Sequence, residues 1–439
     1  MKFRDIKITF FNFLPYECVA AEEYLELMAE KGWLLQSIKG AFLKFKKIEP
    51  QKIKYSVDVL HKVSIFDRKD SDVALEYRDY CQTAGWNYVC QKGKIQIFYT
   101  EDNKKTISIH TDEDEKFKSV FKASLYYVGS QFILTLLFIL NLKLQLFSGA
   151  TDLALGSNLG ILSTVGMVSL IFMYSIEIIS FFLWVIKVSS KLKENKFMPY
   201  NNYKQLRIKN ILRNAYGLII FLLLLKFSVF DKQGSNGSNI SILMIMCIPI
   251  IIMICVQNLI NKKKFSKKIN MAITISSTLV SISLVVMLAG GLAFRSFNAI
   301  EQSKVPTEKV SLTLMDFGYK ENADPSPYIT FDKSILAERI FYAYSNGDND
   351  ISYTILESQY PWVIEFDENR LLSRLHGYGV DLKQEGTNLP SDIKVYLDSK
   401  KRIFVLVSED RVVDIRKDFS GISDDEFLNK VYKKLFINQ

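Results

Sequence analysis

The sequence predicts a multi-domain membrane protein: an N-terminal α+β domain with an internal repeat, five transmembrane helices and a small C-terminal α+β domain. Three observations predict this class. Five long apolar stretches occupy the middle of the 439-residue chain, lysines cluster in alternate connections between them, and polar sequence flanks them. About 20 apolar helical residues cross a hydrocarbon core about 30 Å thick. The expected parts are residues 1–120, 121–295, a linker at 296–308, and 309–439.

The N-terminal domain contains an internal repeat with an offset of 53 positions. The offset superposes Gly32 and Trp33 on Gly85 and Trp86, and four further pairs of identical residues share the register. Each copy is predicted to be a strand, an amphipathic helix and a strand hairpin. Each repeated glycine is expected just after its helix, in the left-handed conformation that glycine adopts readily. The predicted domain has helices on one face of a mainly antiparallel sheet.

The two tryptophans have two interpretations. In the first, Trp33 and Trp86 each fold back onto the preceding helix and anchor the core. In the second, they form an aromatic ligand clamp between the two halves of the domain. Core anchoring is the favoured interpretation.

The two helix sequences resemble those of a known family. The segments that carry the resemblance are AEEYLELMAEKGW and EYRDYCQTAGWNYV. They look like the bacterial membrane-protein family called domain of unknown function 2812, over about residues 8–120 of this chain. Family members are often encoded beside PadR-type transcriptional repressors, which implies regulated expression in a stress or envelope response. The family has no established activity, so the resemblance implies no functional residues.

Charge placement predicts the orientation of the five spans. The spans are expected at residues 121–147, 159–186, 211–230, 241–260 and 271–294. The connection after the second span carries eight Lys/Arg and one Glu through Arg213, and residues 261–270 carry five Lys and no acid. Residues 148–158 have no cation, and residues 231–239 have only Lys232. Short cationic loops stay in the cytoplasm. The N-terminus is therefore expected inside and the C-terminal domain outside.

The net charge of +9 follows from this topology. The two cationic connections contribute +12 together, so the rest of the chain sums to −3. Such connections suit contact with anionic lipid, worth about 1 kcal/mol per residue near the surface. Nucleic acid is therefore not an expected partner. The expected partners are the lipid bilayer, a cytoplasmic protein and an envelope component.

Cysteine and histidine provide little material for metal binding or catalysis. Three of the five cysteines fall in the N-terminal domain, two in the fourth span and none after residue 295. No cysteine pair has metal-ligand spacing with a histidine nearby, and the chain has three histidines. Gly-rich phosphate loops and nucleophile elbows are also missing from the sequence. We therefore expect no enzyme, no metal and no cofactor.

Glu177 is the candidate functional residue within the spans. It lies near the middle of the second span, where an ionisable side chain is costly and normally has a partner. One interpretation is a proton or cation site, or a pairing point with another helix. The alternative is a partly hydrated or protonated carboxyl group at a helix interface.

The C-terminal domain is predicted from short apolar runs between turn residues. Strands are expected at residues 310–314, 353–356, 362–366, 402–407 and 411–416, and helices at 367–376 and 427–436. A capping box that begins at Ser423 precedes the last helix.

The acidic segment of residues 346–357 has part of the pattern of a calcium-binding loop. Asn346, Asp348, Asp350 and Glu357 have part of the required spacing, but Ile351 stands where such a loop needs glycine. A solvated turn is the favoured interpretation.

These features favour a non-enzymatic transmembrane sensor or regulatory protein. Its outer domain would detect an envelope condition or bind a partner, and its inner domain would engage a cytoplasmic protein. The alternative is an accessory or immunity-type component of an export or antimicrobial-resistance system. A third interpretation is a membrane enzyme acting on lipid or cell-wall precursors.

Overall fold

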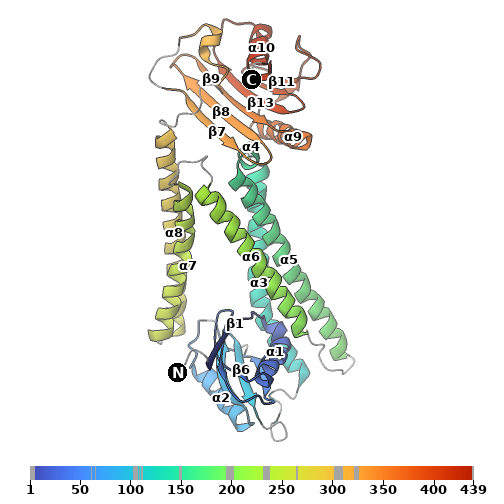
Figure 1. Cartoon of the computed structure of the whole chain (residues 1–439), viewed down its shortest axis with the longest axis vertical. Coiled ribbons are helices and arrows are strands. Elements are labelled where there is room, and N and C mark those ends of the chain that lie inside the picture. The colour runs from blue at the N-terminus through green and yellow to red at the C-terminus, as the bar shows by residue number, and fades with distance from the viewer. Residues whose placement is uncertain are drawn as a thin grey trace. The chain divides into compact units, whose positions relative to one another are not determined.

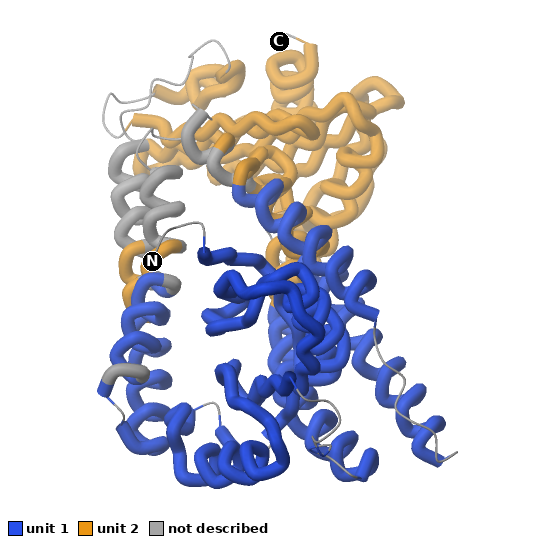
Figure 2. The backbone as a smooth tube through the Cα atoms, turned by 60° about the horizontal axis from the view of Figure 1, so that its bottom comes forward, with its two compact units in different colours: residues 1–137, 170–221, 249–282 blue, residues 138–169, 222–248, 283–439 orange. Residues whose placement is uncertain are grey.

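The computed structural model forms two compact units (Figure 2). Unit 1 comprises residues 1–137, 170–221 and 249–282, and unit 2 comprises residues 138–169, 222–248 and 283–439. The structure describes residues 5–60, 62–64, 66–101, 107, 109, 112–147, 151–193, 202–230, 238–263, 265–300, 310–320 and 326–437. Most of the predicted linker at 296–308 lies outside the described residues.

Two three-stranded antiparallel sheets form the N-terminal part of unit 1 (Figure 1). Their strands are β1 (Ile6–Phe10), β2 (Trp33–Lys39) and β3 (Phe42–Lys47), and β4 (Lys54–Val59), β5 (Asn87–Lys92) and β6 (Ile95–Thr100). The orders β1-β3-β2 and β4-β6-β5 are equivalent. The hairpins also share their register at the 53-residue offset, since Leu34 lies opposite Lys46 and Asn87 opposite Tyr99.

Each sheet is accompanied by one helix. These helices are α1 (Cys18–Glu30), which follows the short helix η2 (Pro15–Glu17), and α2 (Asp72–Thr83). Gly32 and Gly85 follow them with φ angles of +80° and +92°, the left-handed conformation that the sequence predicts. Chain reversal at this point allows each hairpin to begin directly after its helix.

Two acids of α1 complete the free edge of β4. Glu22 Oε1 accepts a hydrogen bond from the backbone nitrogen of Val57 at 2.8 Å, and Glu26 Oε1 accepts one from that of Tyr55 at 3.2 Å. A strand edge normally exposes unpaired backbone groups that invite further strands. Burial raises the pKa of Glu22 to about 7. The two carboxylates therefore replace a fourth strand and tie the two halves of the domain together.

Within the described residues, six helices follow the N-terminal sheets. They are α3 (Glu113–Phe147), α4 (Thr151–Gly156), α5 (Asn158–Lys193), α6 (Tyr203–Phe230), α7 (Ser238–Lys263) and α8 (Lys267–Ile300). Two stretches in the described part are long and apolar enough to cross a membrane, Glu113–Phe147 and Gly160–Lys193.

The predicted number of five spans is not supported. Within the described residues α7 has only a shorter apolar stretch, Cys247–Ile260. The first three turns of α6 are rich in lysine and arginine, and much of the apolar sequence of α6, α7 and α8 runs over side chains outside the description. Polar sequence at a helix end lowers its hydropathy without shortening the helix. A long helix is therefore not by itself evidence of a membrane span.

A seven-stranded antiparallel sheet forms the core of the C-terminal part of unit 2. Its strands are β7 (Tyr328–Lys333), β8 (Glu338–Ser345), β9 (Asp350–Glu357), β10 (Leu382–Gln384), β11 (Lys394–Asp398), β12 (Ile403–Val407) and β13 (Arg411–Asp418). Their order is β10-β11-β12-β13-β9-β8-β7. Sheet parts at both ends of the chain confirm the mixed α+β class.

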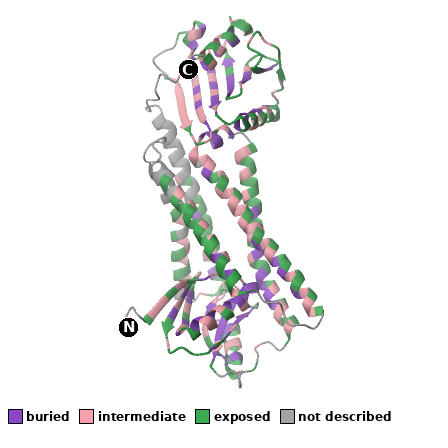
Figure 3. Ribbon diagram, turned by 45° about the vertical axis from the view of Figure 1, so that its right-hand side comes forward, coloured by how far each residue is buried: buried purple, intermediate pink, exposed green. Residues whose placement is uncertain are grey.

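Helices cover both faces of this sheet. The helices η4 (Leu314–Phe317), α10 (Asp424–Tyr432) and η5 (Lys433–Ile437) cover the face that carries Val413 and Ile415. Helix α9 (Pro361–Gly377) lies on the opposite face, which carries Val412 and Leu356. Alternate residues of a strand point to opposite faces. Figure 3 shows buried residues concentrated along these strands.

Two predicted strands of this domain are wrong. Residues 362–366 belong to α9, which begins at Pro361, because buried positions recur at helical spacing from Val363 through Leu371 to Leu375. Residues 310–313 have no regular structure and η4 begins at Leu314. The predicted cap is confirmed, since Ser423 Oγ accepts a hydrogen bond from the backbone nitrogen of Glu426.

The segment with partial calcium-loop spacing begins in the turn between β8 and β9. Asn346 Oδ1 accepts hydrogen bonds from the backbone nitrogens of Asp348 at 3.2 Å and Asn349 at 2.9 Å. The rest of the segment is strand β9. In the described part of the chain, no three His, Cys, Asp or Glu side chains gather in a way that could hold a metal ion.

Replacing Gly32 by alanine should destabilise the protein more than replacing Gly40. Both residues have positive φ, +80° and +60°, which costs about 1–2 kcal/mol for a residue with a Cβ atom. A Cβ on Gly32 would also lie 2.9 Å from the carbonyl oxygen of Ile48, whereas one on Gly40 meets nothing within 4 Å. Thermal unfolding of the purified chain measures the difference. Equal losses of stability would contradict the close approach at Gly32.

Candidate functional site

An ion-pair network surrounds Glu177 in unit 1. Glu177 lies on α5 and is 7% exposed. Its Oε1 lies 3.0 Å from Arg213 Nη1 and 3.6 Å from Lys209 Nζ, both on α6, and Gln131 of α3 donates a hydrogen bond to its Oε2. Lys209 and Arg213 are four residues apart, so both lie on one face of their helix. Three helices therefore meet at this carboxylate.

Glu17 of η2 completes the network from the N-terminal domain. Its Oε1 lies 3.0 Å from Lys209 Nζ, and its Oε2 accepts a hydrogen bond from the backbone nitrogen of Leu14 at 2.9 Å. Glu17 is 5% exposed. Two carboxylates and two cations thus compensate each other, which permits charges to be buried that would be prohibitive alone.

Amide groups fix the orientation of the network. Asn210 accepts a hydrogen bond from Arg213 Nη2 at 2.6 Å and donates one to the carbonyl oxygen of Asn12 at 2.8 Å. Lys92 of β5 donates to the Asn12 side chain at 2.8 Å. Burial lowers the pKa of Lys92 to about 8. The loop before η2 is therefore held from both the sheet side and the helix side.

Aromatic packing surrounds the same loop. The ring of Tyr16 lies 5.7 Å from that of Phe181 and 5.8 Å from that of Trp184, both on α5. Burial, with Glu17 nearby, raises the pKa of the Tyr16 phenol. These residues belong to one apolar cluster that continues through Phe11 and Phe13 into the N-terminal sheets. The domain and helices α3, α5 and α6 thus share a core.

The structure places the two tryptophans in different apolar clusters. Trp86 is 5% exposed, packs with Cys81 and Phe98, and donates a hydrogen bond to the carbonyl oxygen of Ile107 at 2.8 Å. Trp33 is half-buried against the main core, with the Lys7 ammonium 5.2 Å from its ring centre. Trp86 is thus buried in its cluster and Trp33 is partly covered, and core anchoring stays the favoured prediction.

Sequence reasoning singled out Glu177 but not its partners. It assigned Lys209 and Arg213 only to the cationic connection that sets orientation. The signal that could have found them is their four-residue spacing at the start of an apolar helix. Glu17 carries no such signal, because it lies 160 residues before Glu177 and meets it only through Lys209.

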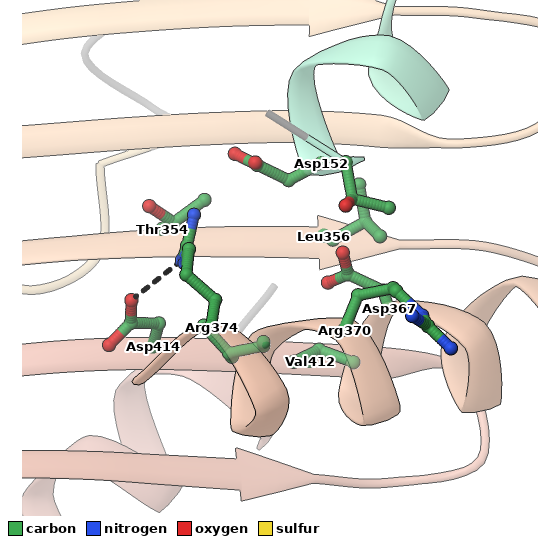
Figure 4. Close-up of a pocket in the computed structure, with 10 residues that line it drawn as sticks. Asp152, Thr354, Leu356, Asp367, Arg370, Arg374, Val412 and Asp414 are labelled. Atoms are coloured by element: carbon green, nitrogen blue, oxygen red, sulfur yellow. Dashed lines mark ion pairs between the residues drawn. The ribbon is translucent and has the colours of Figure 1, made fainter. Parts of the chain in front are cut away.

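A second polar site lies in unit 2, between α4, α9 and the sheet (Figure 4). It is a cavity of about 20 Å³, room for about one water molecule. The lining comprises Thr151, Asp152, Thr354, Leu356, Asp367, Arg370, Leu371, Arg374, Val412 and Asp414. Sequence reasoning missed this site, because its acids and arginines lie on elements far apart in the chain.

Asp367 is the least compensated group in this cavity. It is 5% exposed, and no hydrogen bond or ion pair to its carboxylate is found within the described residues. Burial, with the Asp152 carboxylate nearby, raises its pKa to about 7. Asp414 is better placed, with Arg374 Nη2 at 3.6 Å and Arg416 Nη2 at 3.8 Å, but burial raises its pKa as well.

Helix α4, which connects α3 to α5, is bound to the sheet next to this cavity. Asp152 Oδ2 lies 2.5 Å from Arg339 Nε of β8. Ser334 Oγ donates a hydrogen bond to the carbonyl oxygen of Leu155 at 2.6 Å. A Cβ on Gly156 would lie 2.8 Å from Arg339 Cβ, so the contact is close. Helix α4, within the cation-free connection of residues 148–158, thus packs against the sheet.

An α+β domain with two like sheets, joined through a shared core to apolar helices, is the class that this fold defines. The family described as "Protein of unknown function (DUF2812)" matches residues 18–131, from the start of α1 into α3. The resemblance drawn from the two helix sequences is therefore confirmed. Comparison with curated proteins and with solved structures gave no match.

Breaking the network from one side should cost more than removing both partners. Replacing Arg213 by methionine leaves Glu177 buried beside Lys209 alone, and we expect a loss of about 3 kcal/mol. Adding Glu177→Gln removes the stranded charge and should restore much of that loss. A double-mutant cycle on thermal unfolding measures the coupling.

The matched control for this cycle is Arg207→Met, which removes an exposed cation from the same helix. It should change stability by less than about 0.5 kcal/mol. Simple additivity of the Arg213 and Glu177 variants would show that the pair contributes no coupling.

Raising the pH should weaken the α4–α9 region, and Asp367→Asn should reduce that effect. The native pKa of Asp367 is about 7, against about 4 for an unfolded carboxyl. Between these values the native state holds a proton that the unfolded state releases, so stability falls as pH rises through this window. The full penalty, up to about 4 kcal/mol, is present above pH 7.

Hydrogen exchange of α4 and α9 in the purified chain at pH 5 and pH 8, corrected for intrinsic rates, measures this effect. Some dependence should remain in Asp367→Asn, because burial also raises the pKa values of Asp332 and Asp414. Asp348→Asn, in the exposed turn, is the control. Identical pH profiles for the Asp367 variant and the unchanged protein would be incompatible with this assignment.

Proposed function

We propose that this chain is a membrane-embedded sensor or regulatory protein in which the α3–α4–α5 segment links an extracytoplasmic sheet domain to a cytoplasmic DUF2812 domain. The observation that carries this proposal is the attachment of one helical segment at separate places. Gln131 of α3 and Glu177 of α5 are connected to Glu17 of the N-terminal domain through Lys209 of α6, and Asp152 joins α4 to β8. A segment held in both units transmits displacement better than a free loop.

Apolar exposure supports the membrane location. Only 22% of the most apolar window of α3 and 17% of that of α5 is buried. Large apolar side chains such as Leu136, Phe172 and Leu183 are more than half exposed. A core helix of a water-soluble protein buries such residues, whereas lipid is a suitable solvent for them.

The finer topology remains that of the sequence argument: five spans, the N-terminus inside and the C-terminal domain outside. It rests on the lysine-rich connections after the second and fourth spans. The equivalent strand orders of the two N-terminal sheets support duplication of that domain. Partners are proposed to be a cytoplasmic protein at the N-terminal domain and an envelope molecule at the C-terminal domain.

The sensing event is proposed to occur where α4 contacts the sheet through Asp152 and Arg339, a place called here the seat of α4. Asp152 and Arg339 line an open cleft of about 430 Å³ on the sheet, together with Phe341, Tyr353 and Tyr378. A ligand that competes for Arg339 would release α4 from the sheet. Because α4 directly connects α3 and α5, such a release changes the constraint on both helices.

Releasing α4 by mutation tests the coupling. Arg339→Ala in the full chain removes the pair with Asp152, and we expect faster hydrogen exchange both around α4 and in the N-terminal strands, residues 6–47 and 54–100. Arg402→Ala, which removes a surface cation from the same sheet domain, should leave the N-terminal strands unchanged. Faster exchange confined to unit 2 in Arg339→Ala would contradict transmission through α3 and α5.

A further inference from the structure

A second groove lies in unit 1, between β1, α1 and the start of α6. Its volume is about 360 Å³. The lining comprises Lys7, Thr9, Phe10, Phe11, Tyr24, Leu27, Met28, Lys31, Tyr203, Arg207, Asn210, Ile211 and Asn214. The groove does not overlap the Glu177 network except at Asn210, whose side chain faces Arg213 and Asn12.

The groove is lined by cations and by no acid. Three of its lining residues are Lys7, Lys31 and Arg207, and none is an acid. Lys31 and Arg207 are exposed and form no ion pair within the part of the chain that the structure describes. On the next turn of α6, by contrast, Lys209 and Arg213 are paired with Glu17 and Glu177. Helix α6 thus turns its paired cations inward and presents Arg207 to the groove.

The groove also has an apolar side that water does not favour. Phe10 and Ile211 are 43% and 56% exposed, and Leu27 and Met28 also line the groove. On the same sheet face as Phe10, Phe42 is 55% exposed and lies edge-on to it at 5.2 Å. A ligand for this groove must therefore combine an anionic group with hydrocarbon.

We propose that this groove binds an anionic phospholipid, with its phosphate at Lys7, Lys31 and Arg207 and an acyl chain along Phe10 and Ile211. The inference rests on the proposed membrane location of unit 1. Ile211 begins the stretch of α6 expected as the third span, and Arg207 lies one turn before it, as at the headgroup level of a cytoplasmic leaflet. Basic pockets beside membrane helices are suited to such headgroups.

Native mass spectrometry of the purified full chain tests the site with phosphatidylglycerol as the probe. The unchanged protein should bind phosphatidylglycerol in preference to phosphatidylcholine. The double variant Lys31→Glu/Arg207→Glu should bind phosphatidylglycerol about 25-fold more weakly, on the order of fivefold for each cation lost. The double variant Lys52→Glu/Lys62→Glu changes two exposed lysines outside the groove and should keep the preference.

Two further controls distinguish a lipid phosphate from free phosphate, and a lost binding site from a variant that fails to fold. Inorganic phosphate at the same concentration should not displace the lipid; equal displacement would overturn the lipid as ligand. Arg207→Lys keeps the charge and should keep binding, and a thermal midpoint matching that of the unchanged protein verifies that each variant is folded. Unchanged phosphatidylglycerol binding in Lys31→Glu/Arg207→Glu would overturn the proposed site.

Membrane location itself is tested separately by carbonate extraction of the chain from membranes. Extraction of the unchanged protein into the soluble fraction would overturn the membrane location and with it the lipid site. Retention in the membrane, combined with loss of lipid preference only in the groove variant, supports both. The two failures are thus distinguishable.

Discussion

Charge compensation around Glu177 is the constraint on which unit 1 depends. Neither Glu17 nor Glu177 is tolerable in an apolar surrounding without the cations of α6, and those cations would repel each other there without the acids. The four groups come from the N-terminal domain, α5 and α6, so none of these parts completes its burial alone. The aromatic residues around Tyr16 then exclude water from the joint. For this reason the N-terminal domain and the helices share one core and are not separately packed parts.

Unit 2 solves the same problem less completely. Asp367 is buried beside other acids, and Asp414 Oδ1 has no hydrogen-bond partner among the residues that the structure describes. A buried acid without a partner cation keeps its desolvation cost, which favours opening of the segment that covers it. Within the described residues, Asp367 beside α4 thus lacks the ion pairs that Glu17 and Glu177 have. The proposed sensor role would use this difference in charge compensation, because a signal must move one attachment without breaking the other.

Local pattern was enough to predict α1, α2, the β12–β13 hairpin and the Ser423 cap, since each depends on residues within a few positions of one another. It failed at residues 362–366, where aromatic and branched residues suggested a strand but helical burial after Pro361 decided. It could not find the Glu17–Lys209 pair or the Asp152–Arg339 pair, which join residues 192 and 187 positions apart. Such contacts depend on how distant elements are arranged in space. The periodicity of a single sequence predicts individual elements but not that arrangement.

The cations in the first turns of α6 show that positive side chains in one segment serve two physical purposes. The rule that cationic loops stay inside depends only on the sign and number of charges, so any order of lysine and arginine would satisfy it. Their spacing is a separate property. Positions four apart direct Lys209 and Arg213 to buried acids, and Arg207, two positions before Lys209, falls on a different side of the helix. Membrane orientation therefore depends on how many cations the connection carries, whereas ion pairing depends on where they stand. Moving a cation to another position would keep the net charge and could still break the pairs with Glu17 and Glu177.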